Sequence, residues 1–217
     1  MAGKLIFFID FDGTISREDV CYTMVKTFAR EGWAELNNLW EEGVLSTGDC
    51  AQATLDLMDV LPEQLNSFFN QMKIDPAFPS FLEWIEKQNH PIYILSDGYT
   101  NYIDLILQRE QIDLEYYGNI MEYREGWQVD MPHLNPECGK CGVCKKGKIE
   151  ELAGPGTIKI YVGDGYSDLC PARHCDIVFA KPILADLCSR EEIPFYNFNS
   201  FEDILSKLQQ IFKADKE

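Results

Sequence analysis

The stretch Phe7-Phe8-Ile9-Asp10-Phe11-Asp12-Gly13-Thr14 decides the fold class, because it joins an apolar run to a polar turn. Such an apolar run, ended by polar residues and glycine, is typical of a buried strand in a parallel sheet. Ligands of these sheets bind beyond the carboxyl ends of the strands. Asp10 and Asp12 stand at that end, and a turn at Gly13 would let both carboxylates face one site.

Two later stretches repeat this pattern. Residues 92–95 run into Ser96-Asp97-Gly98, and residues 157–162 run into Gly163-Asp164-Gly165, with Asp168 one helical turn further on. Lys145 follows a cysteine-rich segment between them. Each feature alone is most simply a turn, a capped helix start or a surface lysine. Together, and in this order, they predict the transfer of a phosphoryl group to an aspartate.

The chemistry of a phosphate monoester gives each of these residues a role. A carboxylate must attack the phosphoryl group while the leaving alkoxide takes a proton, so we expect Asp10 as nucleophile and Asp12 as acid, later base. Ser96, expected at a helix N-terminus, suits the phosphate oxygens, and Lys145 would supply positive charge. The remaining candidates for phosphate or substrate binding are Gly13, Thr14, Asp97 and Gly98.

A divalent cation would resolve the repulsion between two carboxylates at one strand end. Mg²⁺ prefers oxygen ligands and is commonly held by one or two carboxylates together with the substrate phosphate. Asp164 is the natural second carboxylate. Asp168 is placed either to hold a metal-bound water or to orient Lys145, and both alternatives are open.

The four segments resemble the four motifs of the haloacid dehalogenase-like phosphatases, and they cover the chain from Phe7 to Asp168. The short interval before Ser96 and the cysteine-rich stretch resemble the branch that includes phosphoserine phosphatase. Residues 130–133 and 141–145 resemble the 2-hydroxy-3-keto-5-methylthiopentenyl-1-phosphate phosphatases. Ser96-Asp97 and residues 168–171 resemble the phosphoethanolamine/phosphocholine phosphatases.

This resemblance implies an α/β fold, with a Rossmann-like core in which helices flank a parallel sheet. It also implies Mg²⁺ on Asp10, on the carbonyl of Asp12 and on Asp164, with Ser96 and Lys145 as phosphate ligands. Asp97 is a departure, because many relatives carry glycine there. A carboxylate beside the phosphate suggests a substrate with an amine or quaternary ammonium group.

An inserted small all-helical cap is expected between the first two motifs. Apolar residues recur at helical spacing from about 18 to 71, with helix starts at Ser46-Thr47 and Leu61-Pro62 and breaks at Gly32 and Gly43. We expect a core of residues 1–16 and 76–217 and a cap of residues 17–75 that closes over the site. Its aromatic residues are interpreted first as core and second as substrate contacts: Phe28, Trp33 and Trp40.

The turn and breaker residues in the rest of the sequence predict an alternation of helices and strands in the core. Helices are expected at residues 78–87, 99–110, 145–153 and 200–212. Strands are expected at residues 92–95, 157–162 and 176–180, and residues 113–129 are expected to form two strands with a turn at Glu125-Gly126.

Composition narrows the class of partner. The chain has 19 Lys and Arg against 36 Asp and Glu, a net charge of -17, which disfavours nucleic acid as a partner. No run of about 18 apolar residues is present, so we expect no membrane span. The N-terminus shows no export signal, and we expect a cytosolic, cytoplasmic enzyme whose partner is a small-molecule phosphate ester.

The eight cysteines are interpreted as reduced thiols or metal ligands rather than as a disulfide framework. Cys138, Cys141 and Cys144 are evenly spaced, and His133 could complete a structural Zn²⁺ site with them. The alternative is a reduced, reactive loop. Because Lys145 follows Cys144 directly, anything that orders this loop would also position the lysine.

We therefore expect a Mg²⁺-dependent phosphomonoester hydrolase that acts on a small metabolite phosphate through a phosphoaspartate at Asp10. Two alternatives remain from other classes. The same aspartyl-phosphate could pass its phosphoryl group to an alcohol, in a phosphotransferase. A non-catalytic redox- or zinc-sensing regulator could use the cysteine loop on a phosphatase scaffold.

Overall fold

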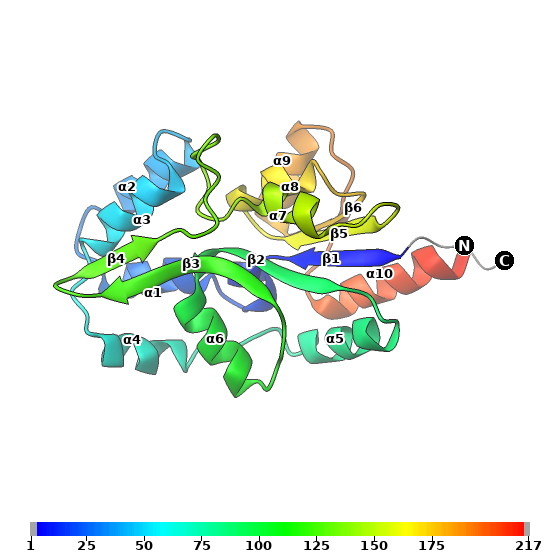
Figure 1. Ribbon diagram of the computed structural model, residues 1–217, viewed down its shortest axis with the longest axis horizontal. Coiled ribbons are helices and arrows are strands. Elements are labelled where there is room, and N and C mark those ends of the chain that lie inside the picture. Colours follow the sequence, from blue (N-terminus) through cyan, green and yellow to red (C-terminus); the bar gives the residue numbers. More distant parts are fainter. Residues whose placement is uncertain (1–3, 215–217) are drawn as a thin grey trace.

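The computed structural model describes residues 4–214, and these residues form a seven-stranded sheet with helices on both faces (Figure 1). Its order is β4-β3-β2-β1-β5-β6-β7, and every neighbouring pair is parallel except β3 and β4. The bounds are β1 Leu5–Ile9, β2 Ile92–Tyr99, β3 Tyr116–Tyr123, β4 Trp127–Asp130, β5 Ile158–Gly163, β6 Ile177–Ala180 and β7 Tyr196–Asn197. This confirms the predicted α/β fold class. Residues 1–3 and 215–217 of the predicted core lie outside the described residues.

The central strand β1 is buried on both of its faces. Leu5, Phe7 and Ile9 belong to the larger core, on the side of α5 (Phe78–Lys87), α6 (Thr100–Arg109) and α10 (Phe201–Ala214). Ile6 and Phe8 pack on the other side with Ile149 of α7 (Lys145–Leu152). That second face also carries α8 (Leu169–Ala172) and α9 (Pro182–Arg190) (Figure 1). Burial on two faces explains why the strand is apolar throughout.

A helical insertion, residues 17–75, separates β1 from α5. Its helices are α1 (Val20–Phe28), α2 (Trp33–Glu41), α3 (Thr47–Leu55) and α4 (Pro62–Phe69). Ser46 caps α3 by accepting the Asp49 N–H at 3.1 Å, and Pro62 opens α4. Gly32 and Gly43 have φ of 107° and 74° and separate the helices. The predicted starts and breaks are confirmed.

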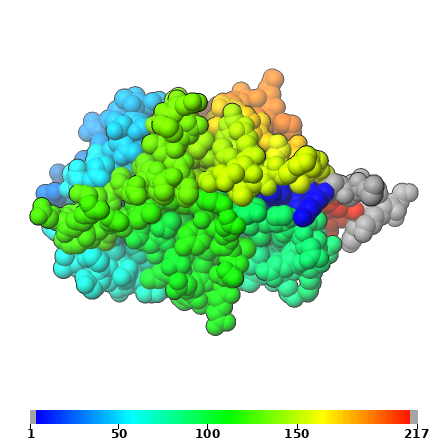
Figure 2. Space-filling view, viewed as in Figure 1, coloured from blue at the N-terminus to red at the C-terminus, as the bar shows by residue number. Residues whose placement is uncertain are grey.

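The insertion is attached to the sheet through β4 and the cysteine-rich segment. The Gln52 amide of α3 accepts the Val129 N–H and donates to the Trp127 carbonyl, each at 3.1 Å. The Trp127 indole donates to the Val60 carbonyl at 2.8 Å. The Thr47 N–H donates to the Lys140 carbonyl at 2.8 Å, which brings the two segments side by side (Figure 2).

One local prediction is wrong. Ser96 was expected at a helix N-terminus, but β2 continues through it to Tyr99 and α6 begins only at Thr100. Tyr99 still pairs with Asn119 of β3, after an irregularity in register that begins at Leu95. Pairing with the neighbouring strand therefore keeps the chain extended where the sequence alone suggested a turn. The short α8, α9 and β7 were not anticipated.

Among residues 4–214, no helix is both long enough and apolar enough to cross a membrane.

Asp75 ties the end of the insertion to the core, and its loss should destabilise the fold. Its buried carboxylate accepts the N–H groups of Ala77 at 2.8 Å and Phe201 at 3.2 Å, at the starts of α5 and α10. We expect Asp75→Ala to lower the free energy of unfolding by about 2–3 kcal/mol, because a buried N–H loses its acceptor. Urea denaturation measures this. Asp59→Ala, at an exposed aspartate, is the matched control, and an equal loss there would contradict the assignment.

Candidate active site

The turn after β1, Phe11–Ile15, is closed by the Ser16 N–H, which donates to the Phe11 carbonyl at 2.9 Å, and its backbone is not helical at Asp12 and Gly13. Gly13 has φ of 67°, and a Cβ atom at this position would lie 2.4 Å from Oδ2 of Asp164. Only glycine therefore lets the turn approach the loop after β5. Gly13 and Thr14 were predicted as phosphate-binding residues, but neither lines the cavity described below, and Thr14 is fully buried.

Lys145 lies at the centre of a buried ion network. Its Nζ donates to Oδ1 of Asp10 at 2.8 Å, to Oδ1 of Asp168 at 2.6 Å and to the Ser167 hydroxyl at 3.0 Å. Burial disfavours its charged form, but the charges of Asp10 and Asp168 outweigh this and raise the pKa of Lys145 well above its ordinary value. The lysine is therefore a fixed positive charge at the tip of β1.

The Asp168 carboxylate is fully engaged by the protein. Besides Lys145, its Oδ1 accepts the Tyr161 hydroxyl at 2.5 Å, and its Oδ2 accepts the N–H groups of Asp164 and Gly165 at 2.9 and 3.1 Å. These contacts favour the alternative in which Asp168 orients Lys145, and they also fix the loop that carries Asp164.

An acidic group at this point fits a hard cation. Carboxylate oxygens of Asp10, Asp164 and Asp168 lie within 4.8 Å of one another. Burial and the charge of Asp168 raise the pKa of Asp164 to about 8, and the same two causes raise the pKa of Asp10. Nearby positive charge does not fully balance the negative charge of these carboxylates. Oxygen ligands with such excess negative charge are the kind that Mg²⁺ prefers. The Asp12 carboxylate is not in this group, which leaves its carbonyl as the predicted ligand atom.

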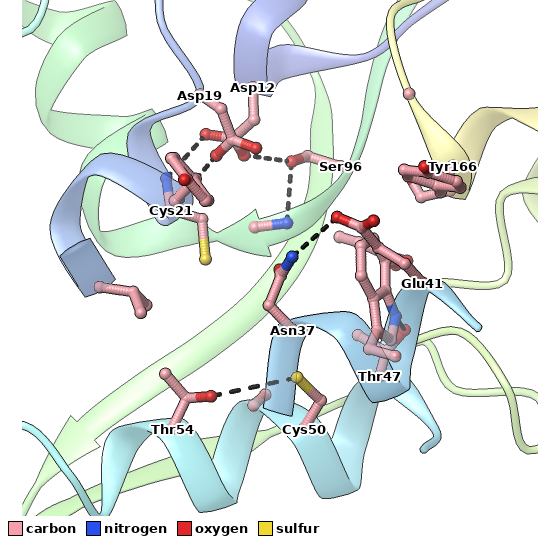
Figure 3. A pocket seen from close by; sticks show the side chains of 18 of the residues that line it. Asp12, Asp19, Cys21, Asn37, Glu41, Thr47, Cys50, Thr54, Ser96 and Tyr166 are labelled. Atoms are coloured by element: carbon pink, nitrogen blue, oxygen red, sulfur yellow. Dashed lines mark hydrogen bonds between the residues drawn. The ribbon is translucent and has the colours of Figure 1, made fainter. Parts of the chain in front are cut away.

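Asp12 occupies a different environment from Asp10. Its Oδ1 accepts the N–H groups of Val20 and Cys21 at 3.0 and 3.3 Å, at the start of α1. Its Oδ2 accepts the Tyr102 hydroxyl at 2.5 Å and the Ser96 hydroxyl at 3.2 Å, the second of which is drawn in Figure 3. The carboxylate that was predicted as acid and base is thus held by four donors from the insertion and from the core.

The pKa of Asp12 is raised to about 7. Burial is the main cause and the charge of Asp19 adds to it, while hydrogen bonds from Tyr102, Cys21 and Ser96 act in the opposite direction. A carboxyl group with this pKa can give and take a proton near neutral pH, which is what an acid that later acts as a base requires.

The Ser96-Asp97-Gly98 stretch supports Asp12 and the cysteine-rich segment. A Cβ atom on Gly98 would lie 2.2 Å from Oδ2 of Asp12 and 1.7 Å from the Tyr102 hydroxyl, so glycine is required there. The Gly98 N–H donates to the Ser96 hydroxyl at 3.0 Å. Oδ1 of Asp97 accepts the Val143 N–H at 2.7 Å, so this carboxylate is directed at the segment that leads into Lys145.

The four residues predicted as a zinc site are not brought together. Within the described part of the chain, the single set of three or more side chains arranged to hold a metal is the aspartate group. Cys138 is exposed, Cys141 and Cys144 are half-buried, and all three are free thiols. The His133 ring packs against Tyr117, with centroids 5.2 Å apart. The structure gives the zinc prediction no support.

The strand ends and the insertion enclose a cavity of about 480 Å³ (Figure 3). Its floor includes Asp10, Asp12, Ser96 and Asp164. The wall from the insertion includes Tyr22, Trp33, Asn37, Trp40, Glu41 and Cys50. Trp33 and Trp40 thus face the cavity, while Phe28 packs on Phe68 in the core. The volume suits a small metabolite.

Three contributors were missed from the sequence. Tyr102 and Tyr161 were not among the predicted site residues, yet their hydroxyls donate to the carboxylates of Asp12 and Asp168. Lys181 follows β6, and its Nζ donates to the Gly13 carbonyl at 2.5 Å, which fixes the tight turn. A lysine at the carboxyl end of a buried strand was an available signal, because Asp10 and Asp164 stand at the same kind of position.

Comparison with known proteins agrees with this geometry. Residues 7–173 match the family model of the haloacid dehalogenase-like hydrolases, and the chain belongs to that family. It is 27% identical to a polyol phosphate phosphatase of Saccharomyces cerevisiae, over 98% of this chain and 96% of that one. It is 29% identical to a 2-hydroxy-3-keto-5-methylthiopentenyl-1-phosphate phosphatase of Bacillus pumilus, over 96% and 92%. These relatives span nearly the whole chain, and the chain is a phosphatase of this family.

Solved structures show the same fold. A phosphoserine phosphatase from T. onnurineus superposes with a TM-score of 0.71 at 13% identity, over 95% of each chain. A phosphoserine phosphatase solved as a phospho-aspartyl intermediate analogue gives 0.68 at 19% identity, over 94% of this chain and 99% of that one. At these identities the likeness concerns the fold alone.

The Tyr102 hydroxyl should set the pH range of the enzyme. It lowers the pKa of Asp12, so Tyr102→Phe should raise that pKa. An acid works while protonated, so kcat/KM should fall as pH rises through about 7, and in Tyr102→Phe this fall should move up by about one pH unit. Phosphate release from glycerol phosphate across pH measures the shift, because its alkoxide leaving group needs the proton. Tyr93→Phe, on the same strand as Ser96, is the control. If the pH profile of Tyr102→Phe coincides with that of the unmodified protein, the role of Tyr102 is refuted.

Proposed function

We propose that this phosphatase is a Mg²⁺-dependent phosphomonoester hydrolase that acts on a small metabolite phosphate through a phosphoaspartate at Asp10. The observation that carries the proposal is the contact of Lys145 with both Asp10 and Asp168, next to Asp164 and at the floor of a cavity. It supports the assignment of a nucleophile, a fixed positive charge and a cluster of oxygen ligands to one strand end.

In the first half of the reaction, an oxygen of Asp10 attacks phosphorus and the bond from phosphorus to the leaving oxygen breaks. The protonated Asp12 carboxyl gives its proton to that leaving oxygen, so an alcohol departs. Lys145 and the Ser96 hydroxyl stabilise the charge on the phosphoryl oxygens. The pKa of about 7 for Asp12 supports this assignment.

In the second half, Asp12 takes a proton from a water molecule, and the water oxygen attacks phosphorus. The bond to Asp10 breaks, inorganic phosphate leaves and both carboxyl groups return to their starting states. Mg²⁺ would be held by Asp10, Asp164 and the Asp12 carbonyl. When bound, it would balance the negative charge of the phosphoryl group.

Residues 17–75 are proposed to act as a cap over residues 1–16 and 76–217. The insertion supplies one wall of the cavity, and two N–H groups at the start of α1 bond the Asp12 carboxylate. Closure of this cap would exclude bulk water from the phosphoryl group. The enclosed volume and the named activities of the relatives, on a polyol phosphate and on a phosphorylated methylthiopentenyl compound, support a small substrate.

Asp97 was expected to select a cationic substrate, and this stays a prediction; the residue lines the cavity, and its hydrogen bonds support a second role. Its carboxylate accepts the Val143 N–H, two residues before Lys145, and its carbonyl accepts the Asn119 amide at 2.6 Å. We therefore assign Asp97 to the positioning of the segment that carries Lys145. The cytosolic location stays a prediction from the sequence.

The decisive test is phosphate release from a panel of metabolite phosphates, with Mg²⁺ and with EDTA. We expect at least one Mg²⁺-dependent substrate, and a loss of about 10³-fold in kcat for Asp10→Asn, because an amide is not a nucleophile. Asp113→Asn, at an exposed aspartate outside the cavity, should match the unmodified protein. Activity that survives Asp10→Asn or EDTA would contradict the mechanism.

The same assay separates hydrolysis from transfer. With glycerol added as an acceptor, a hydrolase releases one inorganic phosphate for each ester consumed, whereas a phosphotransferase releases less and forms glycerol phosphate. If the protein hydrolyses none of the esters, and if its function in the cell is intact in Asp10→Asn, the result would instead favour the non-catalytic regulator.

A further inference from the structure

The charged side chains that line the cavity are acidic. Among residues 4–214, no lysine, arginine or histidine is found in the cavity lining, and Lys145 lies beneath Asp10. Away from the phosphate end, the lining includes the carboxylate of Glu41, whereas Asp19 lies beside Asp12. A leaving group with its own carboxylate would meet no opposite charge there and would be repelled.

Asn37 and Glu41 form a polar pair on α2. They are four residues apart, so they project from the same side of the helix, and Nδ2 of Asn37 donates to Oε1 of Glu41 at 2.7 Å. Both side chains point into the cavity, toward Ser96 (Figure 3). This hydrogen bond occupies one Glu41 oxygen and orients the carboxylate. The pair is rich in acceptors, which bind hydroxyl or ammonium donors.

Glu41 also lies where the insertion meets the core. It lies near Tyr166 of the loop that carries Asp164 (Figure 3), and its charge raises the pKa of the Tyr166 hydroxyl. The Trp40 and Tyr166 rings meet edge to face with centroids 6.1 Å apart. The Trp40 N–H donates to the Thr47 hydroxyl at 3.1 Å, so its ring offers an aromatic wall rather than a donor. Aromatic walls pack on C–H groups and attract cations.

We propose that Glu41, oriented by Asn37, binds the leaving group of the substrate and selects alcohols that carry hydroxyl or ammonium donors over alcohols that carry a carboxylate. This inference rests on the proposed function, because it concerns the same cavity. It assigns selectivity to α2, whereas the floor of the cavity supplies the chemistry.

The test compares kcat/KM for four esters: p-nitrophenyl phosphate as reference, glycerol phosphate, phosphoethanolamine and 3-phosphoglycerate. The unmodified protein should turn over the hydroxyl and ammonium esters better than the carboxylate ester. Relative to the reference ester, Glu41→Gln should lower kcat/KM for the donor-bearing esters by about fivefold and raise kcat/KM for 3-phosphoglycerate by about fivefold. Changes of this size are expected for a solvent-screened charge. Glu41→Lys should enlarge both changes.

Glu42→Gln is the matched control, because this neighbouring glutamate is exposed and does not line the cavity. Its ratios should equal those of the unmodified protein, and thermal unfolding of each variant checks that α2 is intact. A fall confined to phosphoethanolamine identifies an ammonium as the recognised donor, and a fall that includes glycerol phosphate identifies hydroxyls.

Failure of the inference is distinct from failure of the proposed function. If the reference ester is hydrolysed but the ratios do not change in Glu41→Gln and Glu41→Lys, the assignment of Glu41 is wrong and the phosphatase mechanism stands. An equal fall on all four esters would likewise overturn selection by Glu41. If the unmodified protein hydrolyses no ester with Mg²⁺, the proposed function fails and the inference fails with it.

Discussion

The contact of one buried lysine with two buried aspartates constrains the rest of this active site. Lys145 supplies a single positive charge, while Asp10, Asp168 and nearby Asp164 supply three negative ones. Burial makes this excess costly, as the raised pKa values of Asp10 and Asp164 show. A divalent cation bound to the oxygens would remove much of that cost. The Tyr161 hydroxyl and two backbone N–H groups then keep Asp168 in place, so that Lys145 cannot turn away from Asp10.

Two aspartates separated by one residue occupy different environments because the chain turns between them. Asp10 remains in the ion network, whereas Asp12 is directed at the start of α1 and at Tyr102. The turn depends on Gly13, and the place of Tyr102 depends on Gly98, because a side chain at either position would overlap a carboxylate oxygen. Backbone geometry thus gives two aspartates different surroundings, as the proposed roles of nucleophile and acid require, without any difference in residue type.

The sequence predicted the strand-end residues well, because that prediction needs only local patterns and one rule of parallel sheets. Asp10, Asp12, Ser96, Lys145 and Asp164 do meet. The sequence failed where partners come from distant segments. The extension of β2 past Ser96 depends on β3, and the direction of Asp97 depends on the Val143 N–H. The roles of Tyr102 and Tyr161 are invisible to periodicity, since a hydroxyl at a buried position looks like core until its acceptor is known.

The segment before Lys145 connects the two halves of the cavity. Its Lys140 carbonyl accepts the Thr47 N–H at the start of α3, and its Val143 N–H donates to Asp97 at the end of β2. The cavity wall from the insertion and the lysine that contacts Asp10 are therefore tied to the same few residues. Their cysteines need no metal to explain this order, because backbone hydrogen bonds to the insertion and the sheet already supply it. The chemistry can then stay constant on the sheet while the side chains of α2 determine which alcohol is accepted.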